Sequence, residues 1–269
     1  MINTPQKSMR FVSLIFFLSL LCPPGYAHTL NSLPKKDREK IEFLFSYWVQ
    51  RDTLGFLLFG ENKCLTFTGI PITHKKYFLP YKIENGYRFQ RKLVESWYAW
   101  KSYESHFPHP NYLICEKYDR IENETYLQIF IFDKQKLKTT LEKYQRDFAE
   151  ALGEAFTPDG FIAKLEKKKN MRPLIKHDEK LLGILLGFGR EASSAFKDGA
   201  TNENLNPPLE YLGKRPPGCL ITPVCFRGYR SSLETSELLE NYRQEIVEIE
   251  KIFKSDSFLE NVLEIFCAS

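Results

Sequence analysis

The chain has 269 residues, of which 43% are hydrophobic and 27% are charged, a composition typical of a soluble globular protein. Its formal net charge of +4 is too small for a dedicated nucleic-acid-binding protein, which needs a concentrated basic face. We therefore expect no nucleic-acid partner. A chain of this length buries enough surface to fold without a disulfide or a metal, and the sequence predicts no cofactor.

The first 27 residues have the pattern of a secretory signal peptide. Lys7 and Arg10 precede an apolar run over 11–21, and Gly25-Tyr26-Ala27 places small residues at the two positions that a signal peptidase reads. The run is shorter than the roughly 20 apolar residues of a membrane-spanning helix. The sequence thus predicts an exported protein, periplasmic or secreted, with one globular domain over 28–269. The alternative is an uncleaved leader that tethers the domain to the membrane.

In the first half of the domain, helices and β-hairpins are expected to alternate. Residues 28–36 are polar and predict a short arm. A helix is predicted over 35–51, because apolar residues recur there at three- and four-residue steps: Ile41, Leu44, Phe45 and Trp48. Two β-prone runs around a Gly/Asn segment predict a hairpin over 56–67, and prolines predict a loop over 69–84.

A second helix and a second strand pair follow. The helix is predicted over 88–105, with Leu93, Trp97 and Trp100 on its buried side, and Phe107-Pro108 ends it because proline cannot continue a helix. Two apolar runs, 112–118 and 125–132, are expected to pair through a polar turn.

The C-terminal half is expected to be mostly helical. Helix starts are predicted at Asp133, Thr157-Pro158, Asp178, Ser231 and Ser255, each of which offers a capping side chain. Ser231 and Glu234 have the spacing of a capping box for a helix over 233–254. A proline-rich irregular stretch covers 199–218, and a short strand is predicted at 224–227. Antiparallel hairpins packed by several helices make the predicted fold class α+β.

One glycine pattern resembles a dinucleotide-binding fingerprint. Gly187-x-Gly189-x-x-Ala192 fits the loose motif, and Glu210 follows at about the spacing of the ribose-binding acid. However, the segment follows a predicted helix start at Asp178 rather than a strand, and no βαβ unit surrounds it. We therefore expect close helix packing followed by a turn.

The histidines and the basic residues form no strong motif. His28, His74, His106, His109 and His177 show no zinc-binding spacing. His106 and His109 share a proline-stiffened loop that would bind a transition metal weakly, and a helix-stop loop is the favoured interpretation. The basic cluster over 164–169 is expected to be a solvated helix end.

Five cysteines remain once Cys22 in the leader is set aside. Cys219 and Cys225 are the nearest pair, around a predicted turn at Thr222-Pro223, and are the candidates for a disulfide. Small buried hydrophobic residues are the alternative. That alternative is favoured for three of the cysteines, which are Cys64, Cys115 and Cys267.

Two apolar segments carry a family resemblance. Arg51–Gly60 and Leu181–Gly189 together resemble uncharacterised, predicted exported proteins of chlamydia-related intracellular bacteria. That family has no assigned activity. The resemblance therefore implies an envelope or host-directed location and carries over no functional residue.

The leader and the ordinary core favour a non-enzymatic exported protein that binds a protein or envelope partner. The alternative is an exported hydrolase whose cleft lies near residues 199–218. On either hypothesis, contact with a membrane occurs only through an uncleaved leader.

Overall fold

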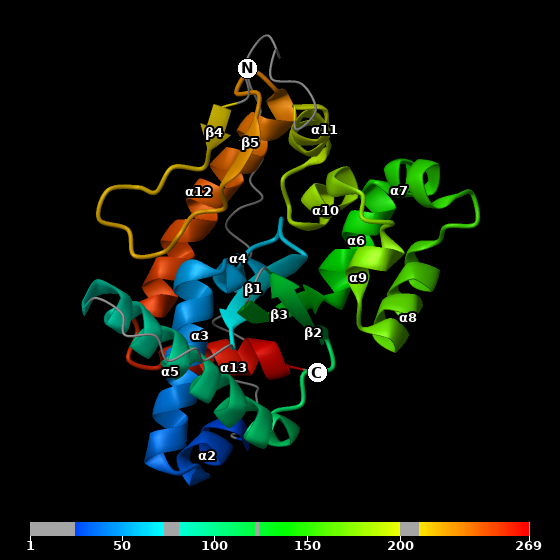
Figure 1. Cartoon of the computed structure of the whole chain (residues 1–269). Coiled ribbons are helices and arrows are strands. Elements are labelled where there is room, and N and C mark those ends of the chain that lie inside the picture. Colours follow the sequence, from blue (N-terminus) through cyan, green and yellow to red (C-terminus); the bar gives the residue numbers. More distant parts are fainter. Residues whose placement is uncertain (1–24, 73–80, 122–123, 200–209, 269) are drawn as a thin grey trace, which may run out of the picture.

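The computed structural model describes residues 25–72, 81–121, 124–199 and 210–268. The leader lies almost wholly outside these residues. The described chain forms an antiparallel sheet of three strands and a smaller sheet of two strands, surrounded by helices (Figure 1). This confirms the predicted α+β class. In chain order the elements are α2 (Gly25–Ser32), α3 (Lys35–Arg51), α4 (Leu54–Phe59), β1 (Leu65–Pro71), α5 (Tyr81–Tyr103), η1 (Glu104–His106), β2 (Tyr112–Ile121), β3 (Glu124–Asp133), α6 (Lys134–Lys143), α7 (Gln145–Leu152), α8 (Pro158–Lys168), α9 (Met171–Leu174), α10 (Glu179–Leu185), α11 (Arg190–Gly199), β4 (Glu210–Leu212), β5 (Phe226–Gly228), α12 (Leu233–Phe253) and α13 (Phe258–Cys267).

The three-stranded sheet has the order β1-β3-β2, so β3 lies in its centre. Both of its pairings are antiparallel, with Phe132 opposite Leu65 on one side and Leu113 on the other. Alternate residues of a strand point to opposite faces. On β3, Ile129 and Ile131 face one hydrophobic cluster while Phe130 and Phe132 face the other. The sheet is therefore buried on both faces and separates two parts of the core.

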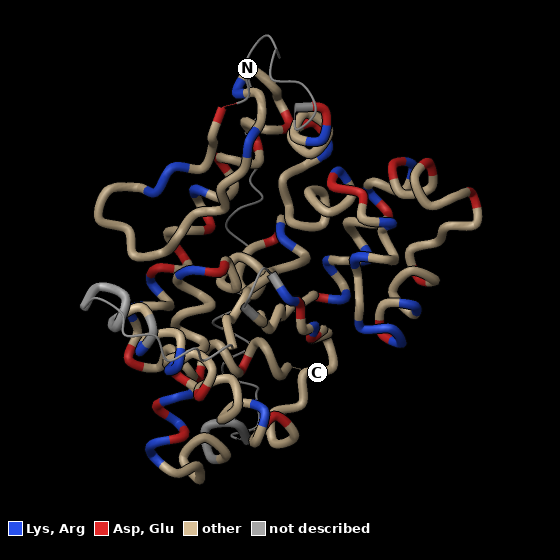
Figure 2. Tube along the Cα trace, viewed as in Figure 1, with Lys and Arg blue, Asp and Glu red and all other residues tan. Residues whose placement is uncertain are grey.

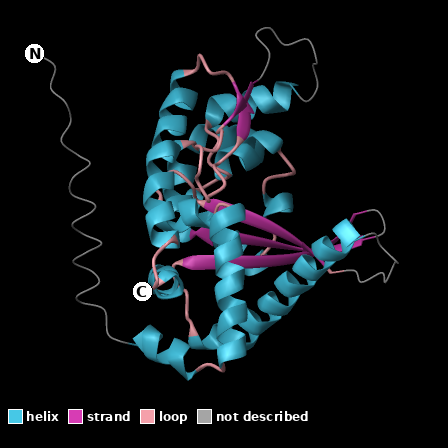
Figure 3. Cartoon of the chain, turned by 90° about the vertical axis from the view of Figure 1, so that its left-hand side faces the viewer, coloured by secondary structure: helices cyan, strands magenta, loops and turns pink. Residues whose placement is uncertain are grey.

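The first cluster is rich in aromatic side chains from α3, α5 and α13. The ring centroid of Phe45 lies 5.4 Å from that of Trp48, 5.1 Å from that of Trp100 and 5.8 Å from that of Phe266, all in edge-to-face contacts. Such pairs add about 0.5–1.5 kcal/mol beyond the area that they bury. The second cluster covers the opposite face with side chains of α6 to α10, among them Phe148 and Phe161. Figure 3 shows the strands running between the helices.

Most elements predicted from local pattern are confirmed. The helix over 35–51 has the predicted bounds, and its four predicted core residues are buried. The strands β2 and β3 form the second predicted hairpin. Three predicted caps accept the expected backbone N–H groups: Asp133 from Lys136 at 2.9 Å, Thr157 from Gly160 at 3.1 Å and Asp178 from Leu181 at 3.0 Å.

The first predicted hairpin, over 56–67, is wrong. Residues 54–59 form the short helix α4, with Leu54, Phe56 and Leu57 fully buried. Only the last three residues of the segment, 65–67, lie in a strand, and this strand, β1, pairs with β3. A short apolar run can be a buried helix or a strand, and periodicity alone does not separate the two.

Further differences concern the ends and continuity of helices. The predicted arm at 28–36 is partly the helix α2, with Leu30 fully buried. The predicted helix after Asp133 divides at Tyr144 into α6 and α7. The N-cap of α12 is Ser232, one residue later than predicted, and Ser257 rather than Ser255 precedes α13. The basic cluster over 164–169 lies at the exposed end of α8, as predicted.

No helix among the described residues is both long enough and apolar enough to cross a bilayer.

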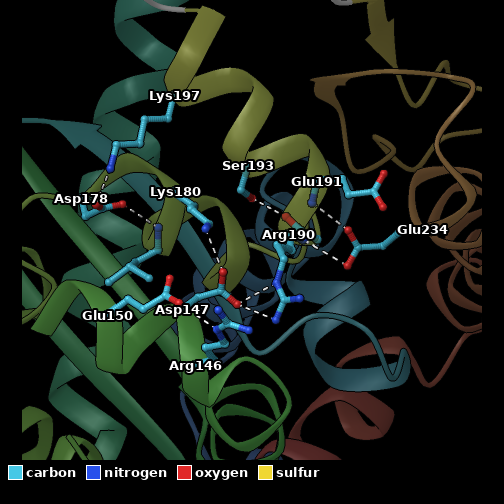
Figure 4. A network of polar contacts seen from close by, with 12 residues as sticks. Arg146, Asp147, Glu150, Asp178, Lys180, Arg190, Glu191, Ser193, Lys197 and Glu234 are labelled. Carbon is cyan, nitrogen blue, oxygen red and sulfur yellow. Dashed lines mark hydrogen bonds and ion pairs between the residues drawn. The ribbon is translucent and has the colours of Figure 1, made fainter. Parts of the chain in front are cut away.

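An ion-pair network links α7 with α10 and α11 (Figure 4). The Asp147 carboxylate on α7 is buried and lies 2.8 Å from Lys180 on α10 and 2.7 Å from Arg190 on α11. Burial opposes ionisation of Asp147, but these two bonds outweigh it and hold the pKa of this carboxyl below its usual value.

Asp52, the C-cap of α3, differs from Asp147 in that its pKa is raised rather than lowered. Its Oδ2 atom is buried without a hydrogen-bond partner among the described residues. Burial raises the pKa of Asp52 to about 6, although a hydrogen bond with Thr68 lowers it. Ionised Asp52 therefore costs the fold free energy at neutral pH.

The two carboxyls predict opposite pH dependences of stability. Asp147→Asn should lower the free energy of unfolding by about 2 kcal/mol at pH 7, because two cations lose their partner. That loss should shrink as the pH falls through the lowered pKa of Asp147. Asp52→Asn should instead raise the free energy of unfolding by about 1–2 kcal/mol at pH 7.5, a gain that fades as the pH falls through about 6 towards 4. Urea denaturation between about pH 7.5 and 2 measures both, because the effect of Asp147 is lost only below the usual pKa of an aspartate. Equal pH profiles for the two variants would contradict the assignment.

Candidate functional site

A cleft of about 170 Å³ lies between α12 and the loop that joins β4 to β5. In Figure 1 this loop runs out beside the upper half of α12. The lining residues come from the loop, from the turn between β5 and α12, and from α12 itself. They are Gly213, Lys214, Pro216, Pro223, Val224, Arg230, Leu239, Tyr242, Arg243 and Ile246.

The loop is held at both ends and along its length. Leu212 and Phe226 pair across the two-stranded sheet, and both are buried. Gly213 has φ +85°, and a Cβ atom there would lie 2.1 Å from the Val224 carbonyl oxygen, so the close approach of the two loop arms requires glycine. The Thr222 N–H donates to the Gln50 carbonyl of α3 at 2.8 Å. These contacts give the cleft a defined wall.

The floor of the cleft is apolar and firmly packed. Val224, Tyr242 and Ile246 are buried. The Tyr242 hydroxyl donates to the Gly187 carbonyl at 2.7 Å, and burial raises the pKa of Tyr242 well above its ordinary value. The phenol therefore stays neutral and offers the cleft an apolar ring rather than a charge.

Three cations surround this floor. Arg230 forms an ion pair with Glu210 at 3.1 Å, and Arg243 pairs with Glu240 one turn earlier on α12. No residue that the structure describes forms a hydrogen bond or ion pair with Lys214. Figure 2 shows the basic residues of the β4–β5 loop in blue. An apolar floor below three cations is suited to binding an anion that carries an apolar group.

Two carboxylates on α12 hold this helix in place. Glu234 accepts the backbone N–H groups of Arg190 at 3.1 Å and of Glu191 at 2.7 Å, at the first turn of α11 (Figure 4). A second pair of bonds lies further along the helix, where Glu245 accepts the Glu61 N–H at 2.8 Å and the Asn62 side-chain amide at 2.9 Å. The capping box predicted for Glu234 is therefore wrong, because its carboxylate binds a different helix.

The glycine pattern at 187–189 lies between two helices and packs against α12. Gly187 has φ +85°, and a Cβ atom there would lie 2.3 Å from the Tyr242 hydroxyl oxygen. Gly189 has φ +77°, and its Cβ would lie 2.7 Å from Leu238. The first turn of α11, where a pyrophosphate would bind, is occupied by Glu234. The glycines thus serve helix packing, as expected.

The histidine loop uses its groups in protein contacts. His109 Nε2 lies 3.2 Å from Glu104, and its Nδ1 lies 3.4 Å from the Tyr112 carbonyl. His106 and His177 are exposed. His74 lies outside the described residues, and the side chain of His28 is not described. Within the described ranges, no three His, Cys, Asp or Glu side chains are grouped to hold a metal ion.

Of the five cysteines that the structure describes, four are buried and Cys225 is exposed. Cys64, Cys115 and Cys267 are buried, which confirms their predicted packing role. The Cys219 thiol donates to the Ile221 carbonyl at 3.6 Å, whereas the thiol of the exposed Cys225 donates to the Gly213 carbonyl at 2.9 Å. The disulfide between Cys219 and Cys225 stays a prediction.

The sequence did not indicate two lysines that bind backbone carbonyls, the buried Lys63 and the half-buried Lys136. Lys63 donates to the Leu186 carbonyl at 2.7 Å, and burial lowers the pKa of its ammonium group to about 8, although Cys64 and Glu245 raise it. Lys136 donates to the Gly60 carbonyl at 2.6 Å. Neither lysine lines the cleft, and both hold backbone carbonyls. Their positions in sequence carry no signal that separates them from exposed lysines.

No protein-family model matches the chain, and no curated protein or solved structure is significantly similar to it. The resemblance to predicted exported proteins therefore stays a prediction.

The contact between Gly187 and Tyr242 predicts a large effect of a small substitution. Gly187→Ala should lower the free energy of unfolding by about 3 kcal/mol, because the new methyl group adds a clash to a strained φ angle. Gly218 is the matched control, since it has φ +75° and no atom within 4 Å of the added methyl group. Gly218→Ala should cost only about 1 kcal/mol.

Chemical denaturation of both alanine variants measures this difference. Adding Tyr242→Phe to the Gly187→Ala variant should restore part of the lost free energy of unfolding, because it removes the hydroxyl oxygen that clashes with the new methyl group. Equal losses for the two alanine variants would show that Gly187 does not limit the approach of α12.

Proposed function

We propose that this chain is an exported, non-enzymatic binding protein that takes an anionic partner in the cleft between α12 and the β4–β5 loop. The observation that carries the proposal is the convergence of three cations on one apolar floor. Lys214, Arg230 and Arg243 come from three separate segments, yet all line the same cleft. Export rests on the leader pattern of residues 1–27.

The rigidity of the cleft supports a binding role. Pro216 and Pro223 fix φ at two points of the loop, and Gly213 lets its arms approach closely. A preformed wall lowers the entropy that is lost when a ligand binds. The floor does not need to rearrange either, since Tyr242 is already bonded to Gly187.

The predicted hydrolase cleft near 199–218 overlaps this site in part, through residues 213–216. The described lining consists of cations, prolines, glycine, aliphatic side chains and one neutral tyrosine. These groups bind charge and apolar surface. Cys225 lies beside the cleft, but its thiol donates to the Gly213 carbonyl, and burial raises its pKa away from the reactive thiolate. Binding is therefore the function that this geometry favours.

A ligand panel tests the proposal. Carboxylates, phosphates and sulfates, each paired with an uncharged isostere, are screened by ligand-observed NMR against the full domain. We expect some anions to bind and their isosteres to bind at least tenfold more weakly, because the isosteres lose the attraction of the cations. The double variant Lys214→Gln/Arg243→Gln should lose this binding.

Arg227→Gln is the matched control. Arg227 is an exposed arginine on β5, opposite Tyr211, on the side of the ribbon away from the buried Leu212 and Phe226. It should bind like the parent protein. Equal binding of anions and isosteres, or equal losses in both variants, would contradict the assignment of the site.

Export is tested by N-terminal sequencing of the protein recovered from the organism. A mature chain that begins at His28 is expected, since Ala27 ends the predicted cleavage site. An intact N-terminus in a membrane fraction would favour the tethered alternative. An intact N-terminus in the cytosol would end the export hypothesis without affecting the cleft.

A further inference from the structure

We infer that the ligand of the cleft is a monocarboxylate that carries one compact apolar group. This inference rests on the proposed binding function and specifies the chemistry of the partner. The charge that the cleft leaves unbalanced, its size and the composition of its floor each support it.

The charge balance of the cleft calls for a single negative charge. Among the described residues, three cations line the cleft, and two of them already pair with carboxylates: Arg230 with Glu210 and Arg243 with Glu240. One net positive charge remains. A carboxylate neutralises it, whereas a phosphate monoester near pH 7 carries about −1.5 to −2 charges and would leave an excess of negative charge.

Lys214 is the group that we expect to meet the carboxylate first. It is exposed, it lines the cleft, and no described residue pairs with it. Arg243 faces the same cleft from α12, and its ion pair with Glu240 is exposed on both sides. An exposed ion pair contributes only about 0–1 kcal/mol, so Arg243 is able to turn toward a ligand at little cost.

The size of the cleft sets the size of the apolar group. Its volume of about 170 Å³ is close to that of a roughly 150 Å³ apolar cavity that binds benzene. Clefts for drug-sized ligands start at about 300 Å³. One branched aliphatic group or one small ring therefore fills the cleft.

The floor accepts such a group. Val224, Tyr242 and Ile246 are buried and form its base, with the half-buried Leu239 beside them. An aliphatic group on this surface would leave water, while the carboxylate stays among the cations. A free carboxylic acid and the C-terminal residue of a peptide both present this combination of groups.

Calorimetry with five probes tests the inference. The reference probe is 4-methylpentanoate, and the others are its amide, acetate, 3-methylbutyl phosphate and a tetrapeptide that ends in leucine with a free carboxylate. We expect 4-methylpentanoate to bind at least tenfold more tightly than its amide and acetate, and more tightly than the phosphate. Lys214→Gln should weaken its binding about tenfold, and Arg227→Gln should leave it unchanged.

The possible outcomes separate this inference from the proposed function. Tighter binding of the phosphate would overturn the monocarboxylate and keep the cleft as an anion site. Binding of acetate as tight as that of 4-methylpentanoate would overturn the role of the floor. Failure of every anion to bind would overturn both proposals. If the monocarboxylate binds, the affinity of the tetrapeptide identifies the source of the carboxylate. A peptide that binds as tightly as 4-methylpentanoate, or more tightly, indicates that the natural ligand is the C-terminus of a peptide. A peptide that binds more weakly indicates that the natural ligand is a free acid.

Discussion

Carboxylates of α12 that accept backbone N–H groups fix the position of this helix, and the cleft depends on that position. Glu234 binds the first turn of α11, where the partial positive charge of the helix dipole favours an anion. Glu245 binds the Glu61 N–H in the segment before β1. These bonds lie about three turns apart along α12, so they restrain both its rotation and its tilt. Tyr242, Arg243 and Ile246 of the same helix are thereby presented to the β4–β5 loop.

These polar contacts place the elements, but they are not the main source of stability. The Oε2 atom of Glu245 is buried with no hydrogen-bond partner among the described residues, and burial raises the pKa of this carboxyl despite its bonds to Glu61 and Asn62. Asp52 carries a similar cost. The favourable term comes from the two apolar clusters on either side of the sheet, where burial stabilises the fold by roughly 25 cal/mol per Å² of apolar surface. Buried charges thus specify the arrangement that the apolar core stabilises.

Features that depend on residues close together in the sequence could be predicted, whereas contacts between distant segments could not. The helix over 35–51 and the caps at Asp133 and Asp178 depend on residues within a few positions of each other, so pattern and spacing predicted them. The strand or helix choice for 54–59 depends on burial from all sides, which the short apolar run does not encode. Glu234 has the spacing of a capping residue for its own helix, yet it caps a helix that starts 44 residues earlier in the chain. The sequence placed a cleft near residues 199–218 only as part of the hydrolase alternative. It did not indicate the cations at 214, 230 and 243, because they share no spacing that marks a site.

The account of function reduces to one claim, that an apolar monocarboxylate sits between the β4–β5 loop and α12. A crystal structure of the domain grown with 4-methylpentanoate tests it most directly. The account predicts density for the carboxylate within hydrogen-bonding distance of Lys214 or Arg243, with the methyl groups against Val224 and Ile246. Ordered ligand at another surface, or a cleft that stays filled with water at saturating ligand, would contradict it.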